Sequence, residues 1–236
     1  MRLNFADERV LAVVAHPDDA ELLCAGTLAR ARKNGATIAV CVLCQGDKGQ
    51  PATPIPNLTD VRRSEAAAAA KLLGAELFTG DFPDGELADT TESRRKLIAI
   101  YREYCPTLIL AHALEDYHPD HRAAGALAEA ASWFCASGGY MPELPKVESQ
   151  PELWFMDTIN MSGFEPSFYV NVTEYADLKQ QMLRCHKSQL ARWEDRDFSP
   201  LEEVMRLQYS ARGAQAGVPA AEAFRVHTAW KRARAW

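Results

Sequence analysis

The stretch VVAHPDDAEL, Val13 to Leu22, joins an apolar run to a histidine, a proline and two adjacent aspartates. The run reaches back to about residue 9. A short run without polar alternation is typical of a strand that is buried on both faces of a parallel sheet. His16, Asp18 and Asp19 follow directly where this strand ends. Because these groups are costly to bury and able to bind a metal, the stretch predicts a polar site at the edge of the sheet.

Apolar segments of strand length alternate with segments of helical periodicity along the rest of the chain, which is typical of βαβ units. We predict strands near residues 9–15, 37–43, 75–79, 107–112, 153–158 and 168–172. We predict helices near residues 20–34, 60–73, 91–104, 121–136, 176–190 and 200–211, with C-caps at Asn34-Gly35 and Gly74. The sequence therefore predicts an α/β fold with a mostly parallel sheet and helices on both faces.

The chain has 236 residues and a hydrophobic content of 47%, which suits one globular domain. We expect a single domain over 1–236, with a core over about 1–175 and a helical or mixed C-terminal extension over about 176–236. Two long loops, 46–59 and 137–152, are rich in glycine and proline. Loops of this length are often functional, so we expect both loops and the C-terminal region to build the walls of a pocket.

Charge and composition exclude several classes of function. The net charge is −6 and no basic run is present, so nucleic acid is not an expected partner. No apolar run approaches the roughly 18 residues of a membrane span, and the N-terminus does not resemble an export signal. We therefore expect a cytoplasmic protein with a small-molecule substrate, and we expect a homo-oligomer.

Six cysteines are too few to indicate a disulfide scaffold. Cys41 and Cys44 form one CxxC pair, which raises the question of a redox or zinc-ribbon role. They lie inside the apolar run TIAVCVLC, and the chain has no second CxxC to complete a ribbon. We interpret both as reduced thiols packed in the core.

The order of the strands brings two distant polar segments together. In a doubly wound sheet, ligands bind outside the carboxyl ends of the strands where the strand order reverses. In the order 3-2-1-4-5 the first and fourth strands flank that crevice. The fourth strand ends in His112, and the segment ALEDYHPDH follows it, with His118 and His121. We therefore expect these histidines to face His16, Asp18 and Asp19.

Histidine and aspartate side chains that converge from different loops form a typical zinc ligand set. A catalytic zinc keeps three protein ligands, and His16, Asp19 and His121 would provide them. Asp18 could then take a proton from the attacking water, and His118 could reach the developing oxyanion. Other interpretations stay open, because aspartate is a common helix N-cap. The segment HPDH could be a turn before a helix that Asp120 caps, and Asp116 and Asp120 could instead orient the histidine ligands.

The chain resembles the LmbE-like, or PIG-L, family of zinc-dependent N-acetylglucosaminyl deacetylases. Its two signature motifs are matched by HPDDAEL at 16–22 and HPDHRA at 118–123. Further matching stretches are VRRSEA at 61–66, FPDGEL at 82–87, CHKSQ at 185–189 and AEAFR at 221–225. Where the family often has HPDDE, this chain has HPDDAE, so no family role is carried over to Glu21.

The resemblance implies a Rossmann-like, three-layer α/β/α fold and hydrolysis of an acetamide on an amino sugar. It implies one zinc ion per subunit, although other divalent metals are compatible, with His16, Asp19 and His121 as ligands. It also implies that Asp18 is the general base and that His118 stabilises the oxyanion. Arg62 matches an arginine that binds sugar hydroxyls, although it could instead be solvated at a helix start.

Four other residues have less specific signals. Asp84 lies in a ProAspGly turn, but it could contact substrate. His112 could line the crevice or be hydrogen-bonded for structural reasons. His186 lies on an amphipathic helix, where packing explains it as well as substrate contact does. His227 lies near the C-terminal tail, and we assign it no role.

The expected activity is hydrolysis of an N-acetyl or other N-acyl group on an amino sugar or glycoconjugate by a metal-activated water. An amidase that acts on a thiol–amino-sugar conjugate is an alternative with the same chemistry. A non-catalytic nucleotide-binding or ligand-binding module is less favoured, because the first strand is followed by carboxylates and no GxGxxG. A purely structural zinc site is disfavoured because such sites are closed and rich in cysteine.

Overall fold

A computed structural model describes residues 4–195 and 200–228. Seven strands form one sheet in the order β3-β2-β1-β4-β5-β7-β6. The first five strands pair in parallel, whereas β7 runs antiparallel to both β5 and β6. The strands are β1 (Arg9–Val14), β2 (Thr37–Cys44), β3 (Glu76–Phe82), β4 (Leu108–His112), β5 (Glu152–Met156), β6 (Phe168–Asn171) and β7 (Ala221–Val226). The predicted α/β fold and the predicted order of the first five strands are confirmed.

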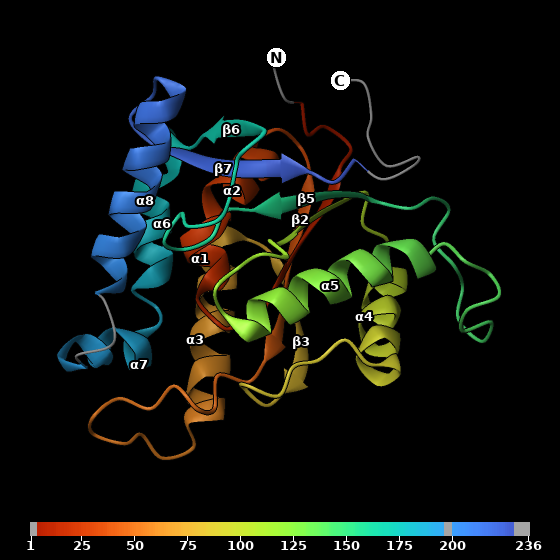
Figure 1. The fold of residues 1–236 in the computed structure, drawn as a ribbon, viewed down its shortest axis with the longest axis horizontal. Coiled ribbons are helices and arrows are strands. Elements are labelled where there is room, and N and C mark those ends of the chain that lie inside the picture. The colour runs from red at the N-terminus through yellow and green to blue at the C-terminus, as the bar shows by residue number, and fades with distance from the viewer. Residues whose placement is uncertain (1–3, 196–199, 229–236) are drawn as a thin grey trace.

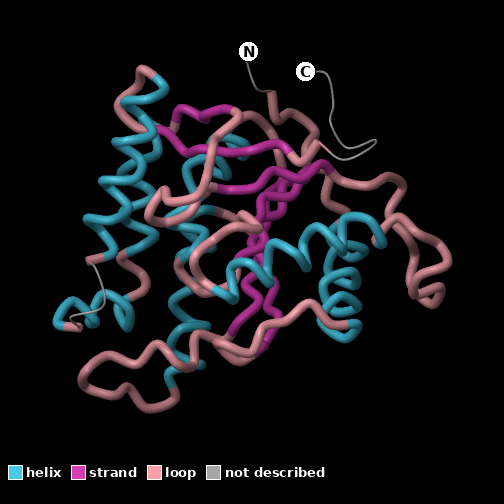
Figure 2. The backbone as a smooth tube through the Cα atoms, in the orientation of Figure 1, coloured by secondary structure: helices cyan, strands magenta, loops and turns pink. Residues whose placement is uncertain are grey.

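Helices cover both faces of the sheet and produce three layers (Figures 1 and 2). One face carries α4 (Thr91–Tyr104) and α5 (Pro119–Phe134). The other face carries α1 (Asp19–Leu23), α2 (Ala25–Lys33), α3 (Leu58–Leu73) and α6 (Ala176–Leu183). Beyond α6 lie α7 (Lys187–Leu190), a short 3-10 turn at Ala191–Glu194 and α8 (Leu201–Ala216). Another 3-10 turn, Thr173–Tyr175, directly precedes α6.

The central strand of the five parallel strands is β1, and its burial explains the apolar run that leads to the polar site. Residues 10–14 are fully buried between β2 and β4. Side chains alternate between the two faces of a strand, so Val10, Ala12 and Val14 pack under α1 and α2 while Leu11 and Val13 pack under α4 and α5. Since both faces of β1 are covered, no polar side chain is tolerated until the strand reaches its carboxyl end.

Gly125 allows α5 to lie close to the end of β4. A Cβ at this position would stand 2.5 Å from the carbonyl oxygen of His112, closer than real Cβ atoms approach. The close approach brings the first turn of α5 over the end of β4. It stacks the ring of His121 on that of His112, with centroids 4.0 Å apart and planes inclined by 16°.

The structure differs from the predicted elements in the C-terminal region. The expected mixed tail contains β7, which is inserted between β5 and β6, so this strand was missed. Its sequence AEAFRV is short, and its pairing with β5 and β6 is a long-range contact that periodicity does not reveal. The helix predicted over 20–34 is divided at Cys24. Gly74 ends α3 in a left-handed conformation and Asn34 ends α2, as predicted.

Cys41 and Cys44 are free thiols buried in β2, and their predicted packing role is confirmed. Burial raises the pKa of Cys41 to about 12. No helix in the described ranges is long and apolar enough to cross a membrane.

Candidate metal centre and active site

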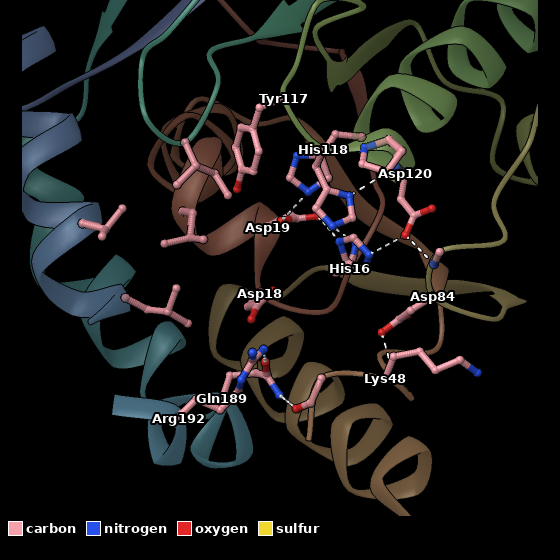
Figure 3. A pocket seen from close by; sticks show the side chains of 18 of the residues that line it. His16, Asp18, Asp19, Lys48, Asp84, Tyr117, His118, Asp120, Gln189 and Arg192 are labelled. Atoms are coloured by element: carbon pink, nitrogen blue, oxygen red, sulfur yellow. Dashed lines mark hydrogen bonds and ion pairs between the residues drawn. The ribbon is translucent and has the colours of Figure 1, made fainter. Parts of the chain in front are cut away.

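A cavity of about 660 Å³ opens at the carboxyl ends of β1 and β4, where the strand order reverses (Figure 3). Such a position and size are typical of a ligand site in an open α/β sheet. Its lining includes most of the side chains singled out from the sequence, namely His16, Asp18, Asp19, Arg62, Asp84, His118, Asp120 and His121. The two motifs, about 100 residues apart in the chain, therefore meet in one cavity.

The turn after β1 holds its two aspartates in different environments. Asp18 has φ 113° and ψ −21°, a backbone conformation that is strained for a residue with a side chain. Asp19 begins α1, and its carboxylate accepts a hydrogen bond of 2.7 Å from the amide of His16. The turn therefore sends Asp19 inward to the histidines and leaves Asp18 beside them at the cavity wall.

Three histidines surround the Asp19 carboxylate. Its Oδ2 lies 3.5 Å from His16 Nδ1 and 3.2 Å from His112 Nε2, and its Oδ1 lies 3.4 Å from His121 Nε2. His112 Nε2 also lies 3.1 Å from the amide nitrogen of Ala15, which donates to it. Asp19 therefore connects side chains from the turn after β1, from β4 and from α5.

Asp116 and Asp120 contact the ring nitrogens of His121 and His16 that face away from Asp19. Asp116 Oδ1 lies 3.1 Å from His121 Nδ1, and Asp120 Oδ2 lies 3.0 Å from His16 Nε2. The amide of Gly85 also donates to Asp120, at 2.8 Å. Carboxylates in these positions fix the orientation of metal-binding imidazoles, which was one of the two interpretations of Asp116 and Asp120 from the sequence.

The charges of the cluster favour a cation. Burial lowers the pKa of His16, but hydrogen bonds to Asp120 and Asp19 outweigh burial and raise it to about 10. In the same way, the attraction of Asp19 and Asp116 outweighs burial and raises the pKa of His121 to about 9. Burial together with the neighbouring His121 lowers the pKa of His112 to about 4. Carboxylates therefore stabilise positive charge at His16 and His121, the two rings proposed as ligands.

His118 caps α5. Its Nδ1 accepts a 3.2 Å hydrogen bond from the amide of Asp120, and Pro119 occupies the first helical position. His118, and not Asp120, is thus the N-cap, which corrects one of the alternatives considered from the sequence. Because Nδ1 accepts, the ring proton is on Nε2, and burial with the neighbouring His121 and His16 lowers the pKa of His118. The structure therefore offers a neutral ring that donates through Nε2, rather than a protonated one.

Arg62 reaches the cavity from α3 and contacts the turn after β1. Its guanidinium donates to the carbonyl of Pro17 and, at 3.0 Å, to Asp18 Oδ2. The side chain is only 4% exposed. Burial raises the pKa of Asp18, whereas the positive charge of Arg62 lowers it. Burial has the larger effect, so the pKa of Asp18 is raised overall. Arg62 therefore orients Asp18, and this contact was not foreseen when Arg62 was assigned to a sugar.

The segment 186–189, which includes the start of α7, contacts three separate elements around the cavity. His186 Nε2 lies 3.4 Å from Glu21 Oε1 in α1. Ser188 donates to Glu65 of α3 through its amide, at 2.8 Å, and its hydroxyl, at 2.6 Å. Gln189 Nε2 donates to the carbonyl of Gly49 in the 46–59 loop, at 2.9 Å. This segment therefore fixes α1, α3 and the 46–59 loop relative to one another.

The sequence model of the GlcNAc-PI de-N-acetylase (PIG-L) family matches residues 11–132, just over half of the chain. The chain belongs to this family. The matched range begins in β1 and ends in α5, so it contains both histidine–aspartate motifs and the strands that hold them.

Relatives of the chain are named for more than one reaction. The chain is 28% identical to 4-oxalmesaconate hydratase of Pseudomonas putida, over 81% of this chain and 78% of the relative. It is 27% identical to diacetylchitobiose deacetylase of Thermococcus kodakarensis, over 77% of this chain and 70% of the relative. The structure of N,N'-diacetylchitobiose deacetylase from Pyrococcus horikoshii superposes with a TM-score of 0.81 and 26% identity, covering 93% of this chain and 84% of that one. The chain is therefore an enzyme of the PIG-L family.

Three groups of side chains in the described part of this PIG-L enzyme bring their possible ligand atoms within 4.8 Å of one another. They are His16 with His118 and His121, Asp19 with His112 and His121, and His16 with Cys44 and Asp120. The predicted set of His16, Asp19 and His121 combines the first two groups through the 3.5 and 3.4 Å contacts of Asp19. Imidazole nitrogens with one carboxylate suit a divalent transition metal, so the donor set fits the metal expected from the sequence.

The structure places two of the expected substrate contacts outside the cavity lining. His112 and His186 are fully buried, and neither lines the cavity. Their contact with substrate stays a prediction from the sequence. Asp84 does line the cavity, but its carboxylate accepts from the amides of Gly46, at 2.7 Å, and Lys48, at 3.2 Å, and so fixes the 46–59 loop. His227 lies 3.3 Å from Glu129, outside the cavity lining.

Only one of the two long loops contributes to the described cavity lining. Lys48 and Gly49 of the 46–59 loop line it, whereas no residue of 137–152 does. That loop lies on the other side of the molecule from α7 and α8 (Figure 1). Arg102 of α4 fixes it there by donating to backbone carbonyls at Met141, 2.6 Å, and Ser137, 2.8 Å.

Several lining residues were missed from the sequence. They are Leu22, Lys48, Tyr117, Ile159, Asn160, Gln189, Arg192, Leu201 and Val204. Tyr117 directly precedes the second motif and Gln189 ends the matching stretch CHKSQ, so adjacency could have indicated both. The apolar residues carry no such signal, because the same residue types fill the core.

Proposed function

We propose that the protein is a metal-dependent hydrolase that removes an acyl group from the nitrogen of an amino sugar or glycoconjugate. The observation that carries this proposal is the single cavity in which Asp18 lies beside a buried cluster of histidines and aspartates. The deacetylase relatives support an acylated amino sugar as the substrate class.

We assign His16, Asp19 and His121 as the metal ligands, with Asp120 and Asp116 orienting the two imidazoles. Two nitrogens and one oxygen favour zinc, with one ion per subunit. When bound, the metal would polarise the amide carbonyl and lower the pKa of water toward about 7.

Asp18 acts as general base in this proposal. Its burial and raised pKa make the carboxylate more basic than a solvated one, and Arg62 keeps it in one orientation. It accepts a proton from the attacking water and then donates that proton to the leaving amine. His118 donates from Nε2 to the carbonyl oxygen as negative charge develops there, since its Nδ1 is held by the amide of Asp120.

The hydratase relative provides a second candidate, addition of water to an unsaturated organic acid. Such a substrate needs basic side chains for its carboxylates. The basic residues in the described lining already contact acids: Arg62 with Asp18 at 3.0 Å, Lys48 with Asp47 at 2.5 Å, and Arg192 with Asp195 at 2.9 Å. A neutral amide of a sugar therefore fits this cavity better than a polycarboxylate.

The general base is tested with Asp18→Asn, which keeps the shape of the side chain and removes the base. We expect amine release from acetylated amino sugars to fall by about 10²-fold or more, while the metal content of the purified protein stays unchanged. Asp60→Asn, a surface change on α3 outside the cavity lining, is the matched control and should keep full activity. Near-native hydrolysis by Asp18→Asn would overturn the assignment.

The substrate class is tested by a screen of the wild-type enzyme with zinc. The panel contains acetylated monosaccharides and disaccharides, thiol conjugates of acetylated amino sugars, and unsaturated organic acids. Amine release from the free sugars supports the proposal, and preference for the thiol conjugates selects the amidase alternative. If the enzyme acts only on the unsaturated acids, seen as loss of the absorbance of their double bonds, the protein is instead a hydratase.

A further inference from the structure

A further group of ligand atoms lies beside the proposed catalytic ligands, and it includes a cysteine that the proposed reaction does not use. A ring nitrogen of His16, the sulfur of Cys44 and a carboxylate oxygen of Asp120 all lie within 4.8 Å of one another. Cys44 is the last residue of β2, His16 lies in the turn after β1, and Asp120 lies in the first turn of α5. Three elements that are distant in the chain therefore bring one nitrogen, one sulfur and one oxygen together.

The nitrogen of this group is the one that faces away from Asp19. Nε2 of His16 lies 3.0 Å from Asp120 Oδ2, the contact drawn between these two side chains in Figure 3. Nδ1 of the same ring lies 3.5 Å from Asp19 Oδ2. Nε2 therefore belongs with Cys44 and Asp120, while Nδ1 is left for the proposed catalytic metal.

Backbone hydrogen bonds hold these side chains in place. The amide of Cys44 donates to the carbonyl of Ala15 at 2.7 Å, which ties the end of β2 to the residue before His16. The amide of Gly85 donates to Asp120 Oδ2 at 2.8 Å. Cys44 is buried, whereas His16 and Asp120 line the main cavity. The group is therefore preformed, and an ion reaches it from the cavity.

Negative charge surrounds the sulfur. Burial raises the pKa of the Cys44 thiol most, and neighbouring carboxylates raise it further, namely those of Asp120, Asp84, Asp19 and Asp47. The same carboxylates favour a cation beside the sulfur. Because a metal must displace the thiol proton, the group favours an ion with high affinity for sulfur. It disfavours Mg²⁺ and Ca²⁺, which prefer oxygen ligands.

We infer that His16, Cys44 and Asp120 form a second metal site, which takes a thiophilic divalent cation such as Cd²⁺. Binding to the metal-free protein releases two protons to solvent, one from the thiol of Cys44 and one from Nε2 of the protonated His16 ring. The proton on Nδ1 stays in place beside the carboxylate of Asp19.

The second site and the proposed catalytic site exclude each other. A neutral imidazole has one N–H and one nitrogen with a free lone pair. When Nδ1 of His16 binds the catalytic metal, Nε2 keeps the proton that Asp120 accepts. When Nε2 binds the thiophilic cation, Nδ1 keeps the proton and the catalytic metal loses a ligand. The cation is therefore an inhibitor, and this exclusion rests on the proposed function, whereas the second site does not.

The site is tested by titrating CdCl₂ into metal-free protein that carries Cys105→Ser and Cys185→Ser, which remove the two cysteines that are not buried. We expect an ultraviolet charge-transfer band from thiolate to cadmium, and one sulfur ligand in X-ray absorption at the cadmium edge. Cys44→Ala in this background should abolish both signals. Cadmium bound by nitrogen and oxygen alone in the parent protein would overturn the site, whatever the stability of the Cys44→Ala variant.

Cys41→Ala in the same background is the matched control. Cys41 is also buried in β2, but it belongs to none of the ligand groups found among the described residues. This variant should keep the band and the sulfur ligand. Loss of both signals in Cys41→Ala, with both retained in Cys44→Ala, would overturn the assignment to Cys44.

The exclusion is tested with zinc-loaded protein and a dye that reports released zinc. Cd²⁺ should release zinc as the sulfur band appears, and each variant is compared with its own activity before cadmium is added. Half-inhibition should need at least about tenfold more Cd²⁺ in Cys44→Ala than in the parent, since even a residue that only supports a metal ligand changes metal affinity by about 10- to 100-fold. A sulfur band that forms with zinc and activity retained would overturn the exclusion.

The spectroscopic measurements separate the second site from catalysis. If the protein hydrolyses no amide but the sulfur band depends on Cys44, the proposed function fails and the second site stands. If the protein hydrolyses acetylated amino sugars but cadmium gains no sulfur ligand, the second site fails and the proposed function is intact.

Discussion

At the scale of the residue, the site depends on a backbone turn that gives two neighbouring aspartates different surroundings. The left-handed conformation of Asp18 directs its side chain toward Arg62, while Asp19 enters the histidine cluster. Strain of this kind persists only when the surroundings hold it, and here Arg62 donates to both Pro17 and Asp18. The turn HPDD therefore gives its two neighbouring aspartates separate partners, as the proposed roles of base and metal ligand require.

The carboxylate behind His121 provides a prediction about metal affinity. Asp116→Asn keeps an oxygen that accepts from the amide of His118 but removes the charge beside His121 Nδ1. We expect zinc affinity to fall about 10- to 100-fold, because the partner of a ligating imidazole sets its orientation and basicity. Titration against a chromophoric chelator measures the change.

Glu115→Gln is the control for Asp116→Asn. Glu115 is the neighbouring residue, but it pairs with Arg225 and lies outside the cavity lining. The zinc affinity of the Glu115→Gln variant should match that of the wild type. A wild-type affinity in Asp116→Asn would show that Asp116 does not support the metal centre.

At the scale of the element, helix α8 is attached to the end of β5 by a buried ion pair. Arg212 and Asp157 are nearly inaccessible, and the pair has two hydrogen bonds. Removing one partner of such a pair leaves a buried charge without a partner. The free-energy cost of that unpaired charge is larger than the net stabilisation that the pair provides. The contact explains how a helix from the C-terminal region becomes part of the cavity.

We predict that Arg212→Met destabilises the protein by about 3–5 kcal/mol, measured by urea unfolding, because Asp157 stays buried without its partner. Arg184→Gln is the matched control, since its ion pair with Glu202 is exposed, and it should change stability by less than about 1 kcal/mol. The double variant Arg212→Met/Asp157→Leu should recover part of the loss. Equal stability of Arg212→Met and Arg184→Gln would contradict this account.

At the scale of the whole molecule, C-terminal segments of the chain pack against the N-terminal part of the core. Glu222 of β7 accepts from the amides of Gly26 and Thr27 at the start of α2, at 2.9 and 2.7 Å, and pairs with the buried Lys179 of α6. These contacts join segments nearly 200 residues apart in sequence. We therefore propose that the chain forms a single domain. A homo-oligomer and a cytoplasmic location stay predictions from the sequence.

Metal removal should lower the stability of this whole domain. A ligand at about 100 times its Kd stabilises the folded state by about 2.7 kcal/mol. For a chain of this length that corresponds to a decrease in Tm of about 5–10 °C after chelation, measured by scanning calorimetry. Re-addition of zinc should restore the Tm, and an identical Tm with and without chelator would argue against a metal centre bridging β1 and α5.

The sequence by itself predicted the parallel sheet, and the common strand order of doubly wound sheets then predicted the meeting of the two motifs. These features follow from contiguous patterns: a fully apolar run predicts a buried strand, and the site of a doubly wound sheet lies where the strand order reverses. Only the tertiary structure decided the insertion of β7, the burial of His112 and His186, and which apolar side chains line the cavity. Each depends on which side of an element faces a partner distant in the chain, and residues such as Leu201 and Val204 look the same in sequence whether they pack in a core or face a cavity.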